Sequence, residues 1–232
     1  MKHLWQRVRQ CPQPTLLAVI VVAFLVFFVQ LVFELPLPDR YGAVPEELTR
    51  AWTQVLEGRF SHRTLFTVTR LFTPLFLHGD VEHVGFNMIF LWCFGSLVAR
   101  HLGKWWVVVL FFVTGACGNI LQVCLNPDSS APIVGASGAV CGCQGIYLGL
   151  ALRWALSWPD VWPLARPIPP LQLAAFAVMG IGLDYFALMN HDGQRIAYGA
   201  HLGGFLSGLV IAACVTQVYP TEASYKMPRH RG

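Results

Sequence analysis

The sequence has few charged residues. Only 12% of its 232 residues are Asp, Glu, Lys or Arg, about half the share of an average soluble domain. This deficit argues against an ordinary soluble globular protein. The formal net charge of +4 is small and scattered, whereas a nucleic-acid-binding surface needs clustered basic residues. We therefore expect no nucleic-acid partner.

Patterns that hold metals or form disulfide frameworks are also missing. The seven cysteines are odd in number and scattered, and no C-x-x-C pair is present. His78, Asp80, Glu82 and His83 lie close together in the sequence, but the H-E-x-x-H pattern of zinc metalloproteases is absent. We predict that the protein uses no metal and no other cofactor.

Apolar residues are abundant and fall into long runs. They make up 55% of the chain, and the mean hydropathy is +0.54. Six runs are each near the ~20 residues that a helix needs to cross a bilayer. The predicted spans are residues 15–35, 82–100, 104–125, 135–153, 169–188 and 196–216. The predicted fold class is an all-α membrane protein, a bundle of six transmembrane helices.

Basic residues indicate how the spans are oriented. They lie before the first span, between the second and third, between the fourth and fifth, and after the sixth. On the opposite side, the short loops contain only Arg195, and the long first loop contains five arginines. The positive-inside rule then places both termini in the cytoplasm. The first span is interpreted as a retained anchor, because no cleavage-site pattern follows its apolar core. We expect a cytoplasmic N-terminus (1–14), a six-span domain (15–216) and a cytoplasmic tail (217–232), in a bacterial cytoplasmic membrane.

The long outer loop, residues 36–81, contains one predicted helix. Pro45 suits the first turn of a helix and Gly58 suits its end. Apolar residues form a stripe along it: Leu48, Trp52, Val55 and Leu56. An amphipathic helix between spans, with Trp on its apolar side, indicates a helix that lies in the membrane interface. A short soluble helix is the alternative.

Small residues recur at helical spacing on two of the spans. The fourth span has Gly138, Gly142, Gly145 and Gly149, and the sixth has Ala200, Gly204, Gly208 and Ala212. Small residues at this spacing let helix backbones approach closely in lipid. We predict that the fourth and sixth spans pack face to face, with Ser137 and His201 at the starts of the two stripes.

Ser137 and His201 suggest nucleophilic chemistry. A histidine within a membrane span is costly and usually faces an interior or a water-filled cavity. Neutral imidazole can take the proton of a serine hydroxyl near pH 7, and attack on a carbonyl then requires donors for the oxyanion. His83 and Asn87, four residues apart, share one helix face, and the N–H of Ser137 is a third candidate donor. Intramembrane Ser and Asn also serve as simple hydrogen-bonding groups, so only the combination indicates catalysis.

Four segments together resemble the rhomboid intramembrane serine proteases. Residues 135–138 match G-x-S-G, residues 200–208 match A-H-x-x-G-x-x-x-G, and residues 83–87 match H-x-x-x-N. Arg70-Leu71-Phe72-Thr73, followed by His78, is similar to the segment that closes the family's first loop. The resemblance covers the membrane core from about residue 66 to residue 212, together with the first span and the loop that precede it.

This resemblance implies a role for each matching residue. Ser137 would be the nucleophile and His201 the base, while His83 and Asn87 would stabilise the oxyanion. Structural support would come from Arg70, His78, Gly135, Gly138, Gly204 and Gly208. The implied substrates are single-span transmembrane proteins with helix-weakening small residues, cleaved within the lipid bilayer.

Two positions depart from the family pattern. Thr69 stands where a Trp usually precedes the loop arginine, and Cys141 stands where an aromatic residue often stacks on the base. Because cysteine has no ring, a non-catalytic relative that binds transmembrane clients is the alternative. A small transporter or channel would predict internal repeats, which we do not find. Asp184 is interpreted as a buried hydrogen-bonding or interface residue.

Overall fold

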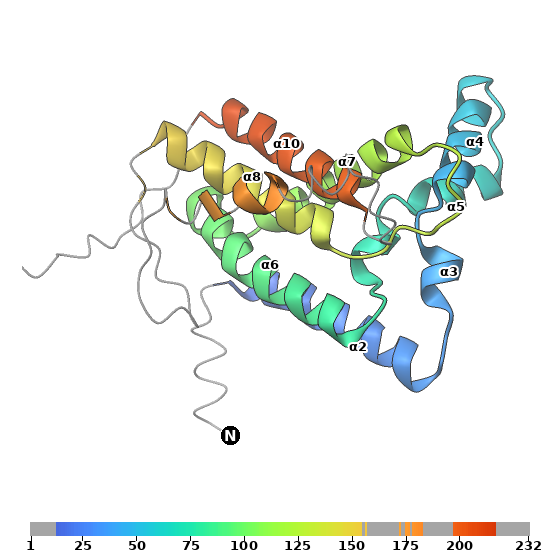
Figure 1. Cartoon of the computed structure of the whole chain (residues 1–232), viewed down its shortest axis with the longest axis horizontal. Helices are drawn as coiled ribbons and strands as arrows, with labels where there is room; N and C mark the ends of the chain where they lie inside the picture. The colour runs from blue at the N-terminus through green and yellow to red at the C-terminus, as the bar shows by residue number, and fades with distance from the viewer. Residues whose placement is uncertain are drawn as a thin grey trace, which may run out of the picture.

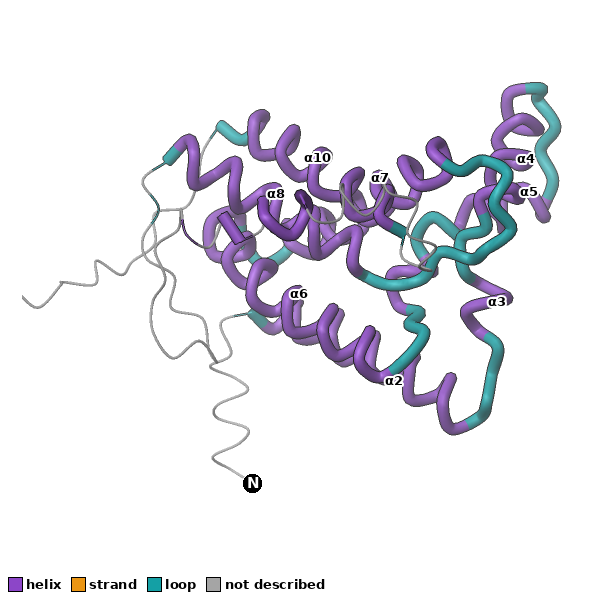
Figure 2. Tube along the Cα trace, in the orientation of Figure 1, coloured by secondary structure: helices purple, strands orange, loops and turns teal. Residues whose placement is uncertain are grey.

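The computed structural model describes residues 13–154, 156, 172, 175–176, 178–182 and 197–216. In this part of the chain the regular structure is helical, apart from one β-bridge. The elements are α2 (Pro14–Val32), α3 (Leu37–Tyr41), α4 (Pro45–Leu56), α5 (His62–Thr69), η1 (Thr73–Phe76), α6 (Val81–Leu102), α7 (Trp106–Leu125), α8 (Ser137–Arg153) and α10 (Tyr198–Cys214). The long helices lie side by side, and α4 and α5 stand at one end of them (Figure 1). Most of the described loops lie at that end (Figure 2).

Among the described residues, three helices are long and apolar enough to cross a membrane: α2, α6 and α7. Helices α8 and α10 each have 17 residues and rise about 26 Å, which is at the short end for a span. Their bounds agree with the fourth and sixth predicted spans. Most of the predicted fifth span, Asp184, residues 1–12 of the predicted N-terminal segment (1–14) and the predicted tail (217–232) lie outside the described residues. The full count of six spans therefore stays a prediction.

Local sequence explains where several helices begin and end. Pro14 opens α2 in the first turn, where a missing N–H costs nothing. Asp80 caps α6, since its side chain accepts a hydrogen bond of 2.7 Å from the N–H of His83. Gly103 ends α6 with a φ of 102°, and Gly58 follows α4 with a φ of 72°, which is a conformation that favours glycine.

The faces of α8 and α10 meet backbone to backbone, as the small-residue stripes predict. A Cβ on Gly204 would overlap the carbonyl oxygen of Gly138, and a Cβ on Gly208 would overlap that of Gly142. Only hydrogen fits at these positions, so the two helices approach as closely as two backbones can. The predicted packing of the two stripes is confirmed.

The apolar core lies where α6, α7 and α8 meet. Leu91, Val98, Phe111, Ile146 and Tyr147 are each almost completely buried there. Helix α2 covers one side of α6 with residues that include Leu16 and Ala23. The opposite face of α2 exposes large apolar side chains such as Phe24, Leu25 and Phe28, a surface suited to lipid rather than water.

The first loop packs on the segment that leads into α8. Ala43 and Ile133 exchange two backbone hydrogen bonds, of 3.1 and 2.8 Å. Leu48 of α4 is buried against both residues. The predicted stripe on α4 is therefore divided: Leu48 faces inward, whereas Trp52 is 62% exposed and Leu56 is 71% exposed. The helix is observed close to its predicted bounds, and its position in the membrane interface stays a prediction.

Candidate active site

The turn before α8 brings two side chains of α6 against the backbone. Gly135 has a φ of 114°, which disfavours any residue with a Cβ. A Cβ at this position would also lie 2.5 Å from Nε2 of His83 and 3.5 Å from Nδ2 of Asn87. The N–H of Gly135 donates to the carbonyl of Pro74 in η1 at 2.9 Å. His83 and Asn87 thus lie beside the chain two residues before Ser137.

Ser137 is the first residue of α8 and is half-buried. The first N–H groups of a helix have no acceptor within the helix, and they lie at the positive end of its dipole. Ala136, with φ −78° and ψ 0°, directs the chain into the helix. The N–H of Ser137 is therefore a candidate donor for an anion beside the serine hydroxyl.

His201 lies in the first turn of α10, at the same level as Ser137. A Cβ on Gly138 would be 3.1 Å from the carbonyl oxygen of Ala200, and these residues directly adjoin Ser137 and His201. His201 is also close enough to His83 for their charges to interact. The structure thus gathers Ser137, His201 and His83 from three different helices.

Asn87 has an unused donor beside this cluster. The side chain is 6% exposed, and its Nδ2 has no hydrogen-bond partner in the described part of the chain. A buried polar group without a partner costs stability. The unpartnered Nδ2 faces Gly135. It is therefore available to donate a hydrogen bond to a transient anion.

His78 contacts three parts of the protein around the turn before α8: Gln30 of α2, Ala136 of the turn and His83 of α6. Gln30 of α2 donates from Nε2 to the His78 carbonyl at 2.9 Å, and Nε2 of His78 lies 3.5 Å from the backbone nitrogen of Ala136. Its ring meets that of His83 edge-on, with centroids 5.1 Å apart. The sequence predicts that His78 fixes the loop to the second span; the structure adds contacts with the first span and the serine turn. Burial, and then the charge of His83, lower the pKa of His78 from 6.5 to about 4, so the ring is neutral near pH 7.

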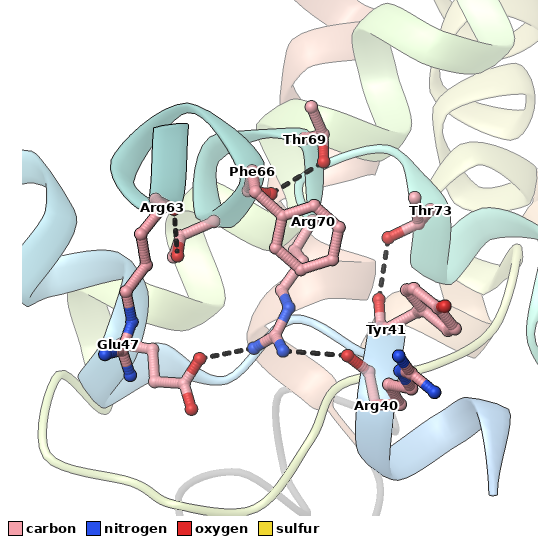
Figure 3. A network of polar contacts seen from close by, with 9 residues as sticks. Arg40, Tyr41, Glu47, Arg63, Phe66, Thr69, Arg70 and Thr73 are labelled. Atoms are coloured by element: carbon pink, nitrogen blue, oxygen red, sulfur yellow. Dashed lines mark hydrogen bonds and ion pairs between the residues drawn. The ribbon is translucent and has the colours of Figure 1, made fainter. Parts of the chain in front are cut away.

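Arg70 supports the first loop rather than the cluster around Ser137. It forms an ion pair with Glu47, donates from Nη2 to the carbonyl of Arg40 at 2.7 Å, and lies 5.6 Å from the ring centroid of Phe66 (Figure 3). Nearby, Thr73 donates to the carbonyl of Tyr41 at 2.6 Å. Arg70 thereby ties α3, α4 and α5 together.

The two departures from the family pattern differ in their surroundings. Thr69 is exposed, its hydroxyl donates to the carbonyl of Phe66 at 2.6 Å, and its carbonyl accepts from the N–H of Phe72 at 2.9 Å, so its effect is local. Cys141 is buried one turn after Ser137. An aromatic ring does reach His201, but from α10: Tyr198 meets it edge-on, with centroids 6.3 Å apart.

Sequence reasoning missed two of these residues. Tyr198 precedes His201 by three positions, a spacing that places both on one helix face and could have revealed the pair. Gln30 is a lone polar residue in the second half of α2, and such a residue in an apolar run usually has a buried partner. Within the described residues, no three His, Cys, Asp or Glu side chains are grouped so that they could hold a metal ion.

Several known proteins that this chain resembles are rhomboid proteins. A family model described as Rhomboid domain matches residues 65–218. Rhomboid protease GluP of Bacillus subtilis is 31% identical over 146 residues, which are 63% of this chain and 26% of that protein. Rhomboid protease GlpG of Salmonella choleraesuis is 29% identical over 63% of this chain and 48% of that protein. Rhomboid-like protease 3 of Toxoplasma gondii is 27% identical, with 63% and 51% covered. The chain thus spans between a quarter and about half of these relatives.

Proposed function

The chain belongs to the rhomboid family, and we propose that it is an intramembrane serine endopeptidase with Ser137 as nucleophile and His201 as base. The observation that supports this most strongly is the meeting of α6, α8 and α10 at one level. There, a serine at a helix N-terminus, a histidine across a glycine contact and an unpartnered amide donor lie together. If these residues had only structural roles, they would not need to lie close together.

In the proposed reaction, His201 takes the proton of the Ser137 hydroxyl as Oγ attacks the scissile carbonyl. The tetrahedral intermediate carries its negative charge on the former carbonyl oxygen. It collapses when His201 gives the proton to the leaving amine, and an ester with Ser137 remains. A water molecule, deprotonated by His201, then attacks the ester and releases the second fragment.

Three donors would stabilise the oxyanion. Nδ2 of Asn87 and Nε2 of His83 flank Gly135, and the N–H of Ser137 lies at the start of α8. Preorganised donors of this kind contribute about 3 kcal/mol each to transition-state stabilisation. Asn87 is the clearest of the three, because its Nδ2 has no other partner in the described part of the protein.

The substrates proposed are single-span membrane proteins, cleaved in or near their spans where small residues weaken the helix. Such residues let the chain unwind, and an extended chain presents its carbonyl to a nucleophile. Water must reach Ser137 for the second step, so the site opens to the outer side of the membrane under the predicted topology. We place the protein as a multi-pass protein of a bacterial cytoplasmic membrane with both termini in the cytoplasm.

The test is cleavage of a model single-span substrate by purified protein in detergent, read on a gel. Wild type should cut and Ser137→Ala should not. Ser207→Ala is a matched control: Ser207 also lies in a membrane helix but donates to the carbonyl of Gly204 at 2.8 Å, and this variant should still cut. A folded wild type that does not cut favours the client-binding alternative. Cleavage by Ser137→Ala would refute the mechanism.

A further inference from the structure

The base proposed above has an aromatic neighbour on its own helix. Tyr198 is the first residue of α10 and His201 follows one turn later. Their rings are perpendicular, at 90°, with centroids 6.3 Å apart. Edge-to-face contact at this separation is a favoured arrangement of aromatic rings. Both side chains are half-buried, so the contact lies at the edge of the cluster rather than in the apolar core.

A base must point one ring nitrogen at the serine hydroxyl. The imidazole of histidine turns about two side-chain bonds, and the second has a broad range of angles. Across from His201, the residue one turn after Ser137 is Cys141, whose side chain has no flat surface to restrict a ring. Tyr198 supplies such a surface from α10.

The Tyr198 ring is not what holds the start of α10 in place. Gly199 packs closely on Gln122 of α7, where an added Cβ would lie 2.5 Å from Oε1. The carbonyl of Ala200 contacts Gly118 of α7 and Gly138 of α8. Backbone packing on two helices therefore fixes this turn. The Tyr198 side chain can then act on the orientation of His201 without determining the fold.

We propose that Tyr198 is a positioning residue that holds the His201 imidazole in the orientation needed to take the Ser137 proton. This role rests on the proposed protease function. It compensates for the lack of a ring at Cys141 with a ring from a different helix. It predicts an effect on turnover and none on substrate affinity, because Tyr198 acts through His201.

The experiment compares three substitutions in the purified full-length chain in detergent. Tyr198→Phe keeps the ring, Tyr198→Leu removes it with little loss of bulk, and Phe86→Leu is the control. Phe86 lies on α6 next to Asn87 and is 61% exposed, so its substitution removes a ring close to the cluster without opening the apolar core. Edge-to-face contacts have energies that correspond to about two- to tenfold in rate. Tyr198→Leu should lower kcat by about that factor with KM unchanged, whereas Tyr198→Phe and Phe86→Leu should retain wild-type kcat.

A second measurement detects the contact between the Tyr198 and His201 rings directly. In the NMR spectrum of histidine-labelled protein, the ring of Tyr198 should shift the His201 ring-proton signals. The shift should persist in Tyr198→Phe and vanish in Tyr198→Leu. Equal loss of kcat in the Phe and Leu variants, a change confined to KM, or absence of the ring shift would each overturn the proposal. A wild type that cleaves nothing refutes the protease function and this role with it, and the ring shift then shows separately whether the contact exists.

Discussion

Two regions of the molecule are stabilised in opposite ways. In the glycine interface, formed by Gly138 and Gly142 of α8 with Gly204 and Gly208 of α10, backbone meets backbone and no side chain intervenes. In the polar loop region, residues 36–80, side-chain bonds add to the backbone pair of Ala43 and Ile133. Arg70 bridges Glu47 and the Arg40 carbonyl, and Gln30 of α2 binds the His78 carbonyl from outside the region.

This difference explains how the residues of the candidate site are held in place. Backbone contact leaves little freedom, so it suits Ser137 and His201, whose proposed proton transfer depends on distance. Side-chain hydrogen bonds contribute about 0.5–1.5 kcal/mol each and can be lost singly. The contact of His78 with Ala136 is such a bond, and with the backbone bond from Gly135 to Pro74 it holds the turn that presents Gly135 to His83 and Asn87. The two regions should therefore respond differently to added bulk, to loss of a polar atom and to pH.

The largest effect should come from bulk in the glycine interface. Gly204→Val places a branched side chain where the Gly138 carbonyl lies, so α8 and α10 cannot pack. The expected cost exceeds the 1–3 kcal/mol that is typical of overpacking, and cleavage should be lost. Unfolding in detergent, followed by circular dichroism, measures the stability.

Gly85→Ala is the matched control for Gly204→Val. An added Cβ on Gly85 meets nothing within 4 Å, and alanine is favoured over glycine in a helix by about 1 kcal/mol. This variant should be as stable as wild type or slightly more stable. If Gly204→Val packs and cleaves normally, the glycine interface is not what holds the dyad.

Where the two regions meet, loss of a polar atom should lower turnover. Asn87→Ala removes Nδ2, which has no partner in the described part of the chain, so the oxyanion loses a donor that these residues do not use. Turnover should fall by about 10²–10³-fold, with unfolding free energy changed by less than about 1 kcal/mol. Steady-state kinetics and chemical unfolding measure the two quantities. Wild-type turnover would remove Asn87 from the site.

The polar loop region should carry a pH-dependent stability through His78. Its pKa is lowered from 6.5 to about 4 in the folded state, so the unfolded chain binds a proton that the folded chain does not between these values. Stability should be fully present above pH 6.5 and fall as the pH drops towards 4, by about 3 kcal/mol in all. His78→Gln should flatten this part of the curve. An unchanged slope in that variant would show that His78 is not the group responsible.

The smallest effect should be the difference in stability between Arg70→Ala and Arg50→Ala. The Arg70 side chain is 12% exposed in its pair with Glu47, and Arg70→Ala should destabilise the protein by about 1–3 kcal/mol, since both this pair and the hydrogen bond of the largely buried guanidinium to the Arg40 carbonyl are lost. The Arg50 side chain is 61% exposed in its pair with Glu46, so Arg50→Ala should change stability by less than about 0.5 kcal/mol. Equal effects in thermal unfolding would contradict the view that Arg70 ties the loop together.

The glycine interface could be predicted from the sequence because its signal is local. Small residues four apart on residues 200–212 and at matching spacing on residues 138–149 identify two faces that can approach closely. The helix starts at Pro14 and Pro45, and the turn glycines at 58 and 135, likewise follow from single-residue preferences. These features locate Ser137 and His201 without knowledge of the fold.

The polar loop region could not be predicted in the same way. The bond from Gln30 to His78 joins residues 48 apart in sequence, and the pair of Arg70 with Glu47 joins residues 23 apart. No periodicity links such residues; only the folded chain brings them together. The ring beside His201 differs from these contacts, because Tyr198 precedes His201 by only three positions and helical spacing alone could have revealed the pair.

The most direct test of the account is whether His201 activates Ser137. Purified protein in detergent is treated with a small fluorophosphonate, and the modified residue is identified by mass spectrometry. We expect one phosphonate per chain, on Ser137, with labelling lost in a folded His201→Gln variant. Labelling of that variant at the wild-type rate, or a folded wild type that takes up no phosphonate, would contradict it.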